Sequence, residues 1–319
     1  MYDAIIIGSG PAGMTAGIYC ARREMKTLII GKEPGGQLIW AAEIENYPGF
    51  KKIKNYELIA RMQEQVIALG VEIKNAEVKE IRENKDDSFV VTIGKEKFRA
   101  KTVIITMGLS PRRLAIPGEE ELTGRGVSYC ANCDGPFFKD KIVAVVGGGN
   151  SAMDAAEVLS KIAKKVYLIH RRAEFRGFEA LVDEVKERDN IELALNSEIK
   201  KIIGDKAVEK IVVYNKETNQ STELNIDGVF IEIGRIANTD LVEKLVKRDQ
   251  RNQIIVDEKC QTSRLGVFAA GDVTQVEFKQ ITIAMGQATI AALAAYQYLQ
   301  LKQGRKIETV VDRSNLKQR

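Results

Sequence analysis

Two cysteines separated by two residues, Cys130 and Cys133, have the spacing in this sequence that most directly permits redox chemistry. In a C-x-x-C segment one thiol can attack a substrate disulfide, and the other can resolve the mixed disulfide that forms. Asp134 follows directly, and its carboxyl group could move a proton to or from the leaving thiolate. The segment therefore predicts a catalytic dithiol with Cys130, Cys133 and Asp134 as its reacting groups.

Cysteines at this spacing also occur in zinc sites, which need about four ligands. The remaining cysteines and histidines are Cys20, Cys260 and the single histidine His170. Each has another explanation, because Cys20 and Cys260 fit as small buried or surface thiols and His170 ends an expected strand. We therefore expect no metal site.

Two glycine-rich segments each lie between an apolar strand and an Ala-rich helix. They read Gly8, Ser9, Gly10, Pro11, Ala12, Gly13 and Gly147, Gly148, Gly149, Asn150, Ser151, Ala152. Such glycines permit a tight turn and let a pyrophosphate reach the N–H groups at the helix N-terminus. Glycines that serve only the turn are the alternative, but a strand before and a helix after favour dinucleotide binding. Two nucleotides are expected.

The end of the strand that follows each glycine segment indicates which nucleotide binds. An acidic residue there would bind a ribose 2′-hydroxyl, whereas basic residues would bind a 2′-phosphate. After the second segment the strand ends in His170, Arg171 and Arg172, with Arg176 one turn further on. Guanidinium groups suit bidentate phosphate binding, so NADPH is expected here, the alternative being a solvated basic helix start.

The strand after the first glycine segment ends differently. Its nearest carboxylate, Glu33, is displaced by about two residues from the expected position, and it is the candidate for the ribose hydroxyl. Gly35, Gly36 and Gln37 follow. Their flexible backbone could approach the rest of a large cofactor closely.

The elements around the two glycine segments repeat one order. The expected strands are Ala4 to Ile7, Thr27 to Ile30 and Thr102 to Thr106 before Gly108 in the first copy, and Ile142 to Val146, Val166 to Ile169 and Val229 to Ile233 before Gly234 in the second. A helix to about Arg23 or Ala163 follows each glycine segment. The sequence therefore predicts an α/β fold of two Rossmann-like, three-layer dinucleotide-binding domains.

A last strand, Val267 to Ala270, runs into Gly271 and Asp272 and precedes an Ala-rich helix from about Gln280 to Leu301. No second-domain motif remains for this strand to complete, so we expect it to return to the first domain. The first domain then comprises 1–116 and 248–319, and the second, 117–247, is inserted in it and carries the cysteines. Two linkers side by side would act as a hinge.

The composition is that of an ordinary globular chain, with 319 residues, 45% hydrophobic and 29% charged. No apolar run approaches the ~18–20 residues of a membrane span, and a net charge of +4 with alternating Lys and Glu does not indicate nucleic acid. The first residues form an expected buried strand rather than a signal peptide. We expect a cytoplasmic protein without membrane or nucleic-acid partners.

Taken together, these segments resemble the low-molecular-weight thioredoxin reductases of bacteria and archaea. The resemblance covers the chain from Asp3 to Leu301. The segments that carry it are Gly8–Gly13, Gly35–Gln37, Glu45–Gly49, Cys130–Gly135, Gly147–Ala152, His170–Arg176 and Gly271–Val273.

The resemblance implies that the first domain binds FAD and the second binds NADPH. Besides the residues above, it places Asn46, Gly108, Gly271, Asp272, Lys279, Gln280 and Ile281 near FAD and Gly234 near NADPH. It also implies that Cys133 faces the flavin and that Cys130 attacks the disulfide of thioredoxin or of a thioredoxin- or glutaredoxin-like redoxin. A homodimer is implied as well.

Three departures from the family pattern bear on the partner more than on the flavin. Lys279 stands where Arg is usual, Met107 lies in a changed segment before Gly108, and Pro136 follows the Cys-Asp-Gly segment as in related alkyl-hydroperoxide-reductase flavoproteins. A dithiol oxidase that uses oxygen, a ferredoxin-dependent reductase and a redox sensor without turnover are the alternatives. The intact second glycine segment and the arginines favour an NADPH-dependent reductase.

Overall fold

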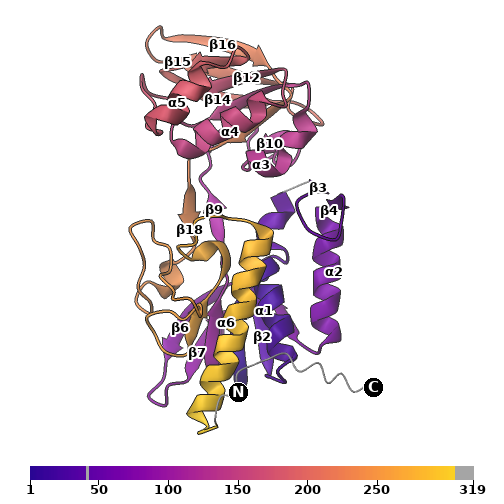
Figure 1. Ribbon diagram of the computed structural model, residues 1–319, viewed down its shortest axis with the longest axis vertical. Coiled ribbons are helices and arrows are strands. Elements are labelled where there is room, and N and C mark those ends of the chain that lie inside the picture. The colour runs from indigo at the N-terminus through magenta and orange to yellow at the C-terminus, as the bar shows by residue number, and fades with distance from the viewer. Residues whose placement is uncertain (41–42, 306–319) are drawn as a thin grey trace. The chain divides into compact units, whose positions relative to one another are not determined.

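The computed structural model of the protein describes residues 1–40 and 43–305. Residues 41, 42 and 306–319, which the predicted first domain includes, lie outside the described residues. The chain forms two compact units (Figure 1). Unit 1 comprises Met1–Gly36, Ile59–Leu109 and Ala237–Arg319, and unit 2 comprises Gln37–Leu58 and Ser110–Ile236.

Unit 1 is built on a seven-stranded sheet. Its strands lie in the order β5 (Glu72–Asn75), β2 (Thr27–Gly31), β1 (Tyr2–Ile7), β8 (Glu96–Ile105), β7 (Phe89–Ile93) and β6 (Val78–Glu83), and β19 (Val267–Ala269) pairs with β8. The pairs among β5, β2, β1, β8 and β19 are parallel, whereas β7 pairs antiparallel with β6 and β8. In register, Ile5 lies opposite Leu28 and Val103. The last expected strand thus does belong to the sheet of the first glycine segment.

The parallel strands of unit 1 are nearly continuous runs of buried apolar residues. Ile5, Ile6, Ile29 and Ile104 are each fully buried, as expected where both faces of a parallel sheet are covered. Burying one such side chain contributes about 1.5–3 kcal/mol. The sheet therefore provides a rigid base for the loops at the carboxyl ends of its strands.

Among the described residues, three α-helices accompany this sheet: α1 (Pro11–Ala21), α2 (Asn55–Ala68), whose first residues group with unit 2, and α6 (Ile281–Lys302). The helices α1 and α6 pack side by side (Figure 1). The buried face of α6 consists mostly of alanine, at positions Ala284, Ala288, Ala291, Ala292, Ala294 and Ala295. Small side chains let two helices approach closely, since the interaxial distance depends on the residues at the contact.

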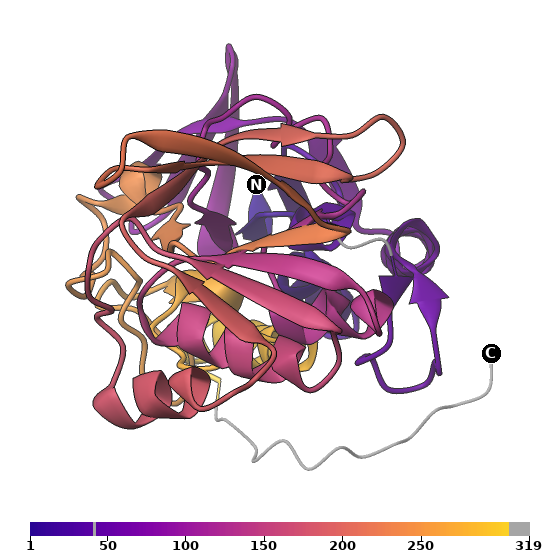
Figure 2. The same cartoon turned by 90° about the horizontal axis from the view of Figure 1, so that it is seen from above.

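Unit 2 contains a five-stranded parallel sheet. The order is β10 (Val127–Ser128), β17 (Gly228–Ile231), β11 (Ile142–Val146), β12 (Lys165–Ile169) and β13 (Ile191–Ala194). The helices α4 (Asn150–Ser160) and α5 (Glu179–Lys186) cover one face, and the antiparallel strands β14 (Ser197–Ile203), β15 (Lys210–Asn215) and β16 (Gln220–Asn225) cover the other (Figure 2).

Alternate residues of β11 serve the two cores of unit 2. Val143 and Val145 pack with residues of α4 and α5, whereas Ala144 and Val146 pack with residues of β14 and β15. This follows from the two-residue period of a strand. Both units thus have the predicted α/β, three-layer build with a parallel sheet, and the predicted fold class is confirmed.

The remaining elements are short. They are β3 (Glu43–Ile44), β4 (Ile53–Lys54), β9 (Leu109–Pro111), β18 (Arg235–Ala237), α3 (Ala131–Asp134) and the 3-10 turns η1 (Gly36–Trp40), η2 (Gly135–Phe138), η3 (Asp240–Val242) and η4 (Gly271–Val273). The strands β9 and β18 pair with each other, and the chain passes between the units through them. These two segments therefore run together, whereas the chain also passes between the units after Gly36 and after Leu58.

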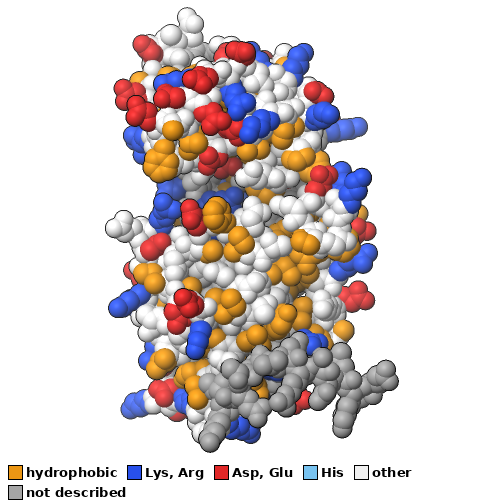
Figure 3. All heavy atoms as spheres, viewed as in Figure 1, with side chains coloured by type: hydrophobic (Ala, Val, Ile, Leu, Met, Phe, Trp, Pro, Cys, Tyr) orange, Lys and Arg blue, Asp and Glu red, His pale blue; other side chains and the backbone are white. Residues whose placement is uncertain are grey.

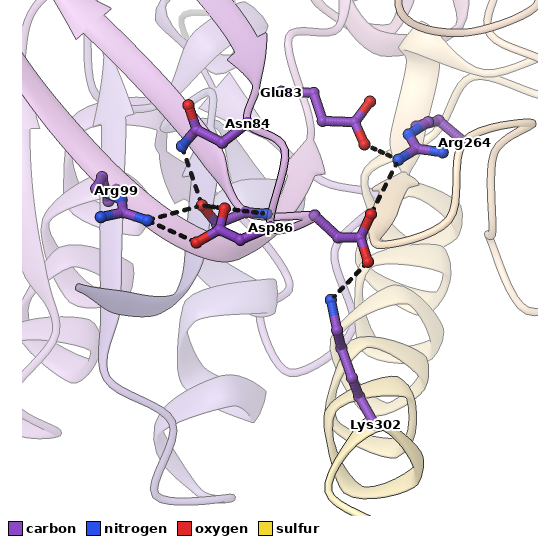
Figure 4. Close-up of polar contacts among 8 residues, drawn as sticks. Glu83, Asn84, Asp86, Arg99, Arg264 and Lys302 are labelled. Carbon is purple, nitrogen blue, oxygen red and sulfur yellow. Dashed lines mark hydrogen bonds and ion pairs between the residues drawn. The ribbon is translucent and has the colours of Figure 1, made fainter.

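A charged cluster ties together three parts of unit 1 that are far apart in the sequence. Arg264, in the loop before β19, pairs with Glu83 of β6 and lies 3.9 Å from Asp87 in the β6–β7 turn (Figure 4). Lys302, the last residue of α6, lies 3.3 Å from the same aspartate. On the other side of this turn, Arg99 lies 2.8 Å from Asp86. Such pairs each contribute up to about 1 kcal/mol when exposed.

Acidic and basic side chains are interspersed over the face of the protein shown in Figure 3. Within the described part of the chain, no helix has both the length and the apolar character needed to cross a membrane. In the same residues no three or more His, Cys, Asp or Glu side chains cluster as metal ligands would.

Candidate active site

Cys130 and Cys133 form a disulfide, as the sequence predicts for the redox pair. Cys130 follows β10 and has the extended backbone of a residue that precedes a helix, with φ −150°. Cys133 lies inside the short helix α3, and the Cα atoms of the two cysteines are 5.3 Å apart. The end of a strand and the start of a helix thus bring the two sulfurs together.

Asp134, the last residue of α3, has a largely buried carboxyl group. Its Oδ2 accepts a hydrogen bond of 2.6 Å from the Ser128 hydroxyl, and the same hydroxyl accepts one of 3.1 Å from the Cys130 N–H. Burial raises the pKa of Asp134, and the hydrogen bond from Ser128 opposes that rise. A carboxyl that stays protonated more readily than usual can donate a proton to a thiolate.

A second carboxyl group, which the sequence reasoning missed, lies at the other end of α3. Glu232 follows β17 and accepts a hydrogen bond from the N–H of Ala131, the first residue of α3. Burial raises the pKa of Glu232 to about 7, although the Arg235 charge acts against the rise. The available signal was a glutamate among the apolar residues that end an expected strand.

The first glycine turn of unit 1 leaves no room for side chains. A Cβ at Gly8, where φ is +116°, would lie 2.3 Å from the Thr106 carbonyl oxygen, and one at Gly13 would lie 1.9 Å from the Gly8 carbonyl oxygen. Gly10 precedes α1, and Pro11 and Ala12 are its first residues. Only glycine at Gly8 and Gly13 lets the chain leave β1 and enter α1 this tightly, so the N-terminus of α1 stays accessible to a phosphate.

The loop after β2 lies against this turn. The Ser9 hydroxyl donates to the Glu33 carbonyl oxygen at 2.9 Å, and the Gly35 N–H donates to the Ser9 carbonyl oxygen at 2.8 Å. The side chain of Glu33 is exposed. The candidate for the ribose hydroxyl and the backbone at Gly36, where φ is +54°, are thereby brought beside the glycine turn.

The other FAD candidates of unit 1 follow β8 and β19. Gly108 and Gly271 both have positive φ, of 63° and 79°. Asp272 lies in η4, and Lys279 donates to its carbonyl oxygen at 3.0 Å. Gln280 directly precedes α6, and Ile281 is its first residue. Because parallel strands end at one edge of a sheet, these residues and the glycine turn after β1 share that edge, whereas Gln37 and Asn46 fall in the stretch that groups with unit 2.

The second glycine turn repeats this arrangement in unit 2. A Cβ at Gly147, where φ is +157°, would lie 2.4 Å from the Glu232 carbonyl oxygen and 2.6 Å from the Ala152 Cβ. Gly149 precedes α4, where Ser151 is exposed, and a Cβ at Gly149 would meet nothing within 4 Å. The Asn150 side chain accepts a hydrogen bond of 2.8 Å from the Phe178 N–H. The turn is tight while its outer side is open, as a pyrophosphate requires.

The basic segment after β12 divides into a buried and an exposed part. Arg171, Arg172 and Arg176 are exposed, and the Arg176 N–H donates to the Gly148 carbonyl oxygen at 2.6 Å. His170 is buried and stacks on Phe175 at 5.4 Å. Burial, with the nearby arginines, lowers the pKa of His170, so the imidazole is neutral at neutral pH. The three arginines therefore supply the positive charge.

Gly234, the last candidate in unit 2, has a positive φ of 103°. Its carbonyl oxygen accepts a hydrogen bond of 2.9 Å from the Arg112 N–H. It therefore lies where the two crossing segments pair rather than in the turn between β11 and α4.

Comparisons with known proteins agree with this geometry. The family described as pyridine nucleotide-disulphide oxidoreductase matches residues 2–288. The chain is 39% identical to a thioredoxin reductase of Listeria innocua over 94% of each chain, and 40% identical to one of Mycolicibacterium smegmatis over 94% of this chain and 97% of that one. The crystal structure of thioredoxin reductase from Streptococcus pyogenes superposes with a TM-score of 0.89 at 42% identity, covering 94% of this chain and 99% of that one. The chain therefore belongs to the pyridine nucleotide-disulphide oxidoreductase family and, within it, groups with the thioredoxin reductases.

Proposed function

We propose that this protein is an NADPH-dependent flavoprotein that reduces the disulfide of thioredoxin, or of a thioredoxin- or glutaredoxin-like redoxin. The observation that carries the proposal is the Cys130–Cys133 disulfide beside the largely buried Asp134, in the same unit as the second glycine turn. Both parts of a reductase, a nucleotide-binding turn and an exchangeable disulfide, thus belong to one unit.

The residues of unit 1 fit FAD. The tight turn at Gly8–Gly13 leaves the start of α1 accessible to the pyrophosphate, and the exposed side chain of Glu33, whose backbone is held beside this turn by Ser9, would bind a ribose hydroxyl. Gly36, Gly108, Asp272 and the first residues of α6 would hold the rest of the cofactor. Gln37, Asn46 and Lys279 remain candidates for the same cofactor.

The residues of unit 2 fit NADPH. The open side of the turn at Gly147–Ala152 would take the pyrophosphate, and Arg171, Arg172 and Arg176 would bind the 2′-phosphate bidentately. Asn150 would act through the Phe178 loop that its side chain holds. His170, buried and neutral, would support the loop rather than carry charge.

When bound, NADPH would supply a hydride, and FAD would accept it and pass the two electrons on to the Cys130–Cys133 disulfide. Cys130 then attacks the partner disulfide as a thiolate, which forms a mixed disulfide and releases one partner thiolate. Asp134 donates a proton to that thiolate. Cys133 loses its proton and attacks the Cys130 sulfur as a thiolate, which breaks the mixed disulfide and forms the Cys130–Cys133 disulfide again. The second partner sulfur leaves as a thiolate and takes up the proton that Cys133 lost, so the partner leaves with both thiols reduced.

We further propose that the FAD domain spans 1–116 and 248–319 and that the NADPH domain, 117–247, turns on its two linkers. The rotation is supported by the paired segments β9 and β18, where the chain passes between the two compact units after Leu109 and after Ile236, because a few linker residues can absorb a large rotation. The rotation would let the cysteine pair and the nicotinamide approach the flavin in turn.

A homodimer in the cytoplasm completes the proposal. The resemblance to the thioredoxin reductases carries the dimer, and exposed apolar side chains of unit 1, among them Ile67, Leu69 and Ile290, would be available to an interface between two copies. Sedimentation of the purified protein would test the dimer.

Anaerobic titration of the purified flavoprotein with NADPH, and separately with NADH, tests the function. We expect NADPH to bleach the flavin absorbance, with uptake above one two-electron equivalent per flavin because the disulfide accepts a further pair. Cys130→Ser should take up only one equivalent, and Cys133→Ser should lose the reduction of thioredoxin. If neither nucleotide bleaches the flavin, the NADPH assignment is wrong, and ferredoxin or oxygen becomes the redox partner to test.

A further inference from the structure

Ser128 is a buried polar side chain next to the reacting groups. It is the last residue of β10, is 4% exposed, and lies between the buried residues Val127 and Tyr129. A hydroxyl in such surroundings costs free energy unless it forms hydrogen bonds. Its partners therefore explain why a serine is accommodated at this position.

The Ser128 hydroxyl connects the Cys130 backbone to the Asp134 carboxyl group. It accepts the Cys130 N–H at 3.1 Å and lies 2.6 Å from Asp134 Oδ2. The Cys130 carbonyl oxygen, at 3.4 Å, is a much poorer acceptor for its single proton. The proton is therefore directed at Asp134, and this bond spans the turn that contains both cysteines.

The two oxygens of Asp134 differ in what they contact. Oδ2 is held by Ser128, whereas Oδ1 is buried and has no hydrogen-bond partner among the described residues. An acid that transfers a proton needs one oxygen fixed for orientation and one left available to the reacting atom. The Ser128 bond leaves Oδ1 in that role.

We propose that Ser128 is a positioning residue for thiol–disulfide exchange, which fixes Asp134 through Oδ2 so that Oδ1 exchanges the proton with the thiols. The inference rests on the proposed function and deepens it. Ser128 also favours the charged form of Asp134 and so opposes the effect of burial. Without the hydroxyl the pKa of Asp134 rises further.

The test is the pH profile of kcat/KM for thioredoxin reduction in the wild type and in Asp134→Asn, Ser128→Ala and Ser128→Thr. Asp134→Asn identifies the limb of the profile that Asp134 governs, because that limb disappears. In Ser128→Ala we expect this limb to move to higher pH, with a loss of about 10-fold in kcat/KM at neutral pH, less than the ~100-fold of a lost general acid. Ser128→Thr keeps the hydroxyl, so it should restore both the position of this limb and kcat/KM at neutral pH.

Ser197 provides a matched control in the same unit. It is also 4% exposed, and its hydroxyl donates to the Leu195 carbonyl oxygen at 2.7 Å. Ser197→Ala should cost similar stability and leave the profile in place. If Ser128→Ala does not fold, Ser128→Thr and Ser128→Val provide a pair that differs only by hydroxyl against methyl.

Two results would overturn the inference. In the first, a variant without the hydroxyl keeps the limb of the pH profile where the wild type has it. In the second, Ser128→Ala loses kcat/KM but Ser128→Thr does not restore it. Failure of the proposed function is seen separately, in the wild-type protein. In that case NADPH does not bleach the flavin, or the bleached protein does not reduce thioredoxin at any pH.

Discussion

Two carboxyl groups accompany the ends of the short helix that carries Cys133. Glu232 accepts the N–H of the first residue of α3, and Asp134 is the last residue of α3. Burial raises the pKa of both. At the residue scale, unit 2 therefore holds two protonatable groups close to the exchangeable sulfurs, and each has a measurable pH dependence.

The protonation of Glu232 should make the stability of the fold depend on pH. Its pKa is raised to about 7 from an ordinary value of 4.5, so its stabilising contribution is full below about pH 4.5 and is lost as the pH rises through 7. The difference corresponds to about 3 kcal/mol. Glu232→Gln should therefore unfold at higher urea concentration than the wild type at pH 8, and the gain should shrink toward pH 5.

The exposed Glu209, in the same unit, gives the control for this series. Glu209→Gln should change the urea midpoint little at either pH. If Glu232→Gln raised the urea midpoint equally at pH 5 and pH 8, the raised pKa of Glu232 would be contradicted. The stabilisation would then come from the amide itself and not from the removal of a buried charge.

At the scale of elements, the sequence predicts both strand–turn–helix units closely. The expected strand Ile142 to Val146 is β11, and the helix expected from Gln280 to Leu301 is α6, which runs from Ile281 to Lys302. The strands could be predicted because burial on both faces of a parallel sheet requires continuous apolar runs. Glycine between strand and helix marks the turn by its steric requirement.

Other elements could not be predicted in the same way. The strand β14 has two consecutive lysines, Lys200 and Lys201, between apolar residues, and β16 (Gln220–Asn225) is mostly polar and exposed. Both patterns are also typical of solvated segments. The contact of Glu232 with Ala131 joins residues far apart in the sequence, so the spacing of residue types along the chain could not predict it. The disulfide and Asp134 were predictable because their chemistry lies within five consecutive residues.

The first glycine turn gives a prediction at the scale of elements. In Gly13→Ala the new Cβ would lie 1.9 Å from the Gly8 carbonyl oxygen, so β1 and α1 cannot keep their spacing. We expect a loss of stability of about 3 kcal/mol or more and a purified protein with little bound flavin. The ratio of flavin absorbance to protein absorbance measures the flavin content.

Gly286 is the matched control for this substitution. It is an exposed glycine of α6, and a Cβ there would meet nothing within 4 Å. Gly286→Ala should keep the flavin and stabilise the fold by about 0.5–1 kcal/mol, because alanine is the better helix former. Equal flavin content in the two variants would contradict the steric argument.

At the scale of the whole molecule, each unit has cores of its own. The core of unit 1 includes Ile5, Leu28 and Phe89, whereas Val143 and Val145 belong to a core of unit 2. Units with separate cores can unfold in separate steps, and a ligand stabilises only the step that destroys its site. Calorimetry can therefore test the proposal that one unit binds FAD and the other binds NADPH.

We expect two thermal transitions for the FAD-loaded protein, of which NADP⁺ raises only one. At about 100 times its Kd the nucleotide adds about 2.7 kcal/mol, which shifts a unit of this size by about 5–10 °C. Scanning calorimetry with and without NADP⁺ measures the shift, and NAD⁺, which lacks the 2′-phosphate, is the control. A single transition, or an equal shift of both, would contradict independent units.

The pairing of β9 with β18 has a consequence for gene architecture. No strand of the seven-stranded sheet lies between Ser110 and Ile236, and the chain enters and leaves this stretch through neighbouring segments. We therefore expect that a coding sequence for 110–236 can be exchanged as one cassette, while Gln37–Leu58, the rest of unit 2, stays in the first part of the chain. The fold is modular in this sense. Replacing 110–236 with a domain that binds another electron donor would leave the sheet that would hold the flavin unchanged.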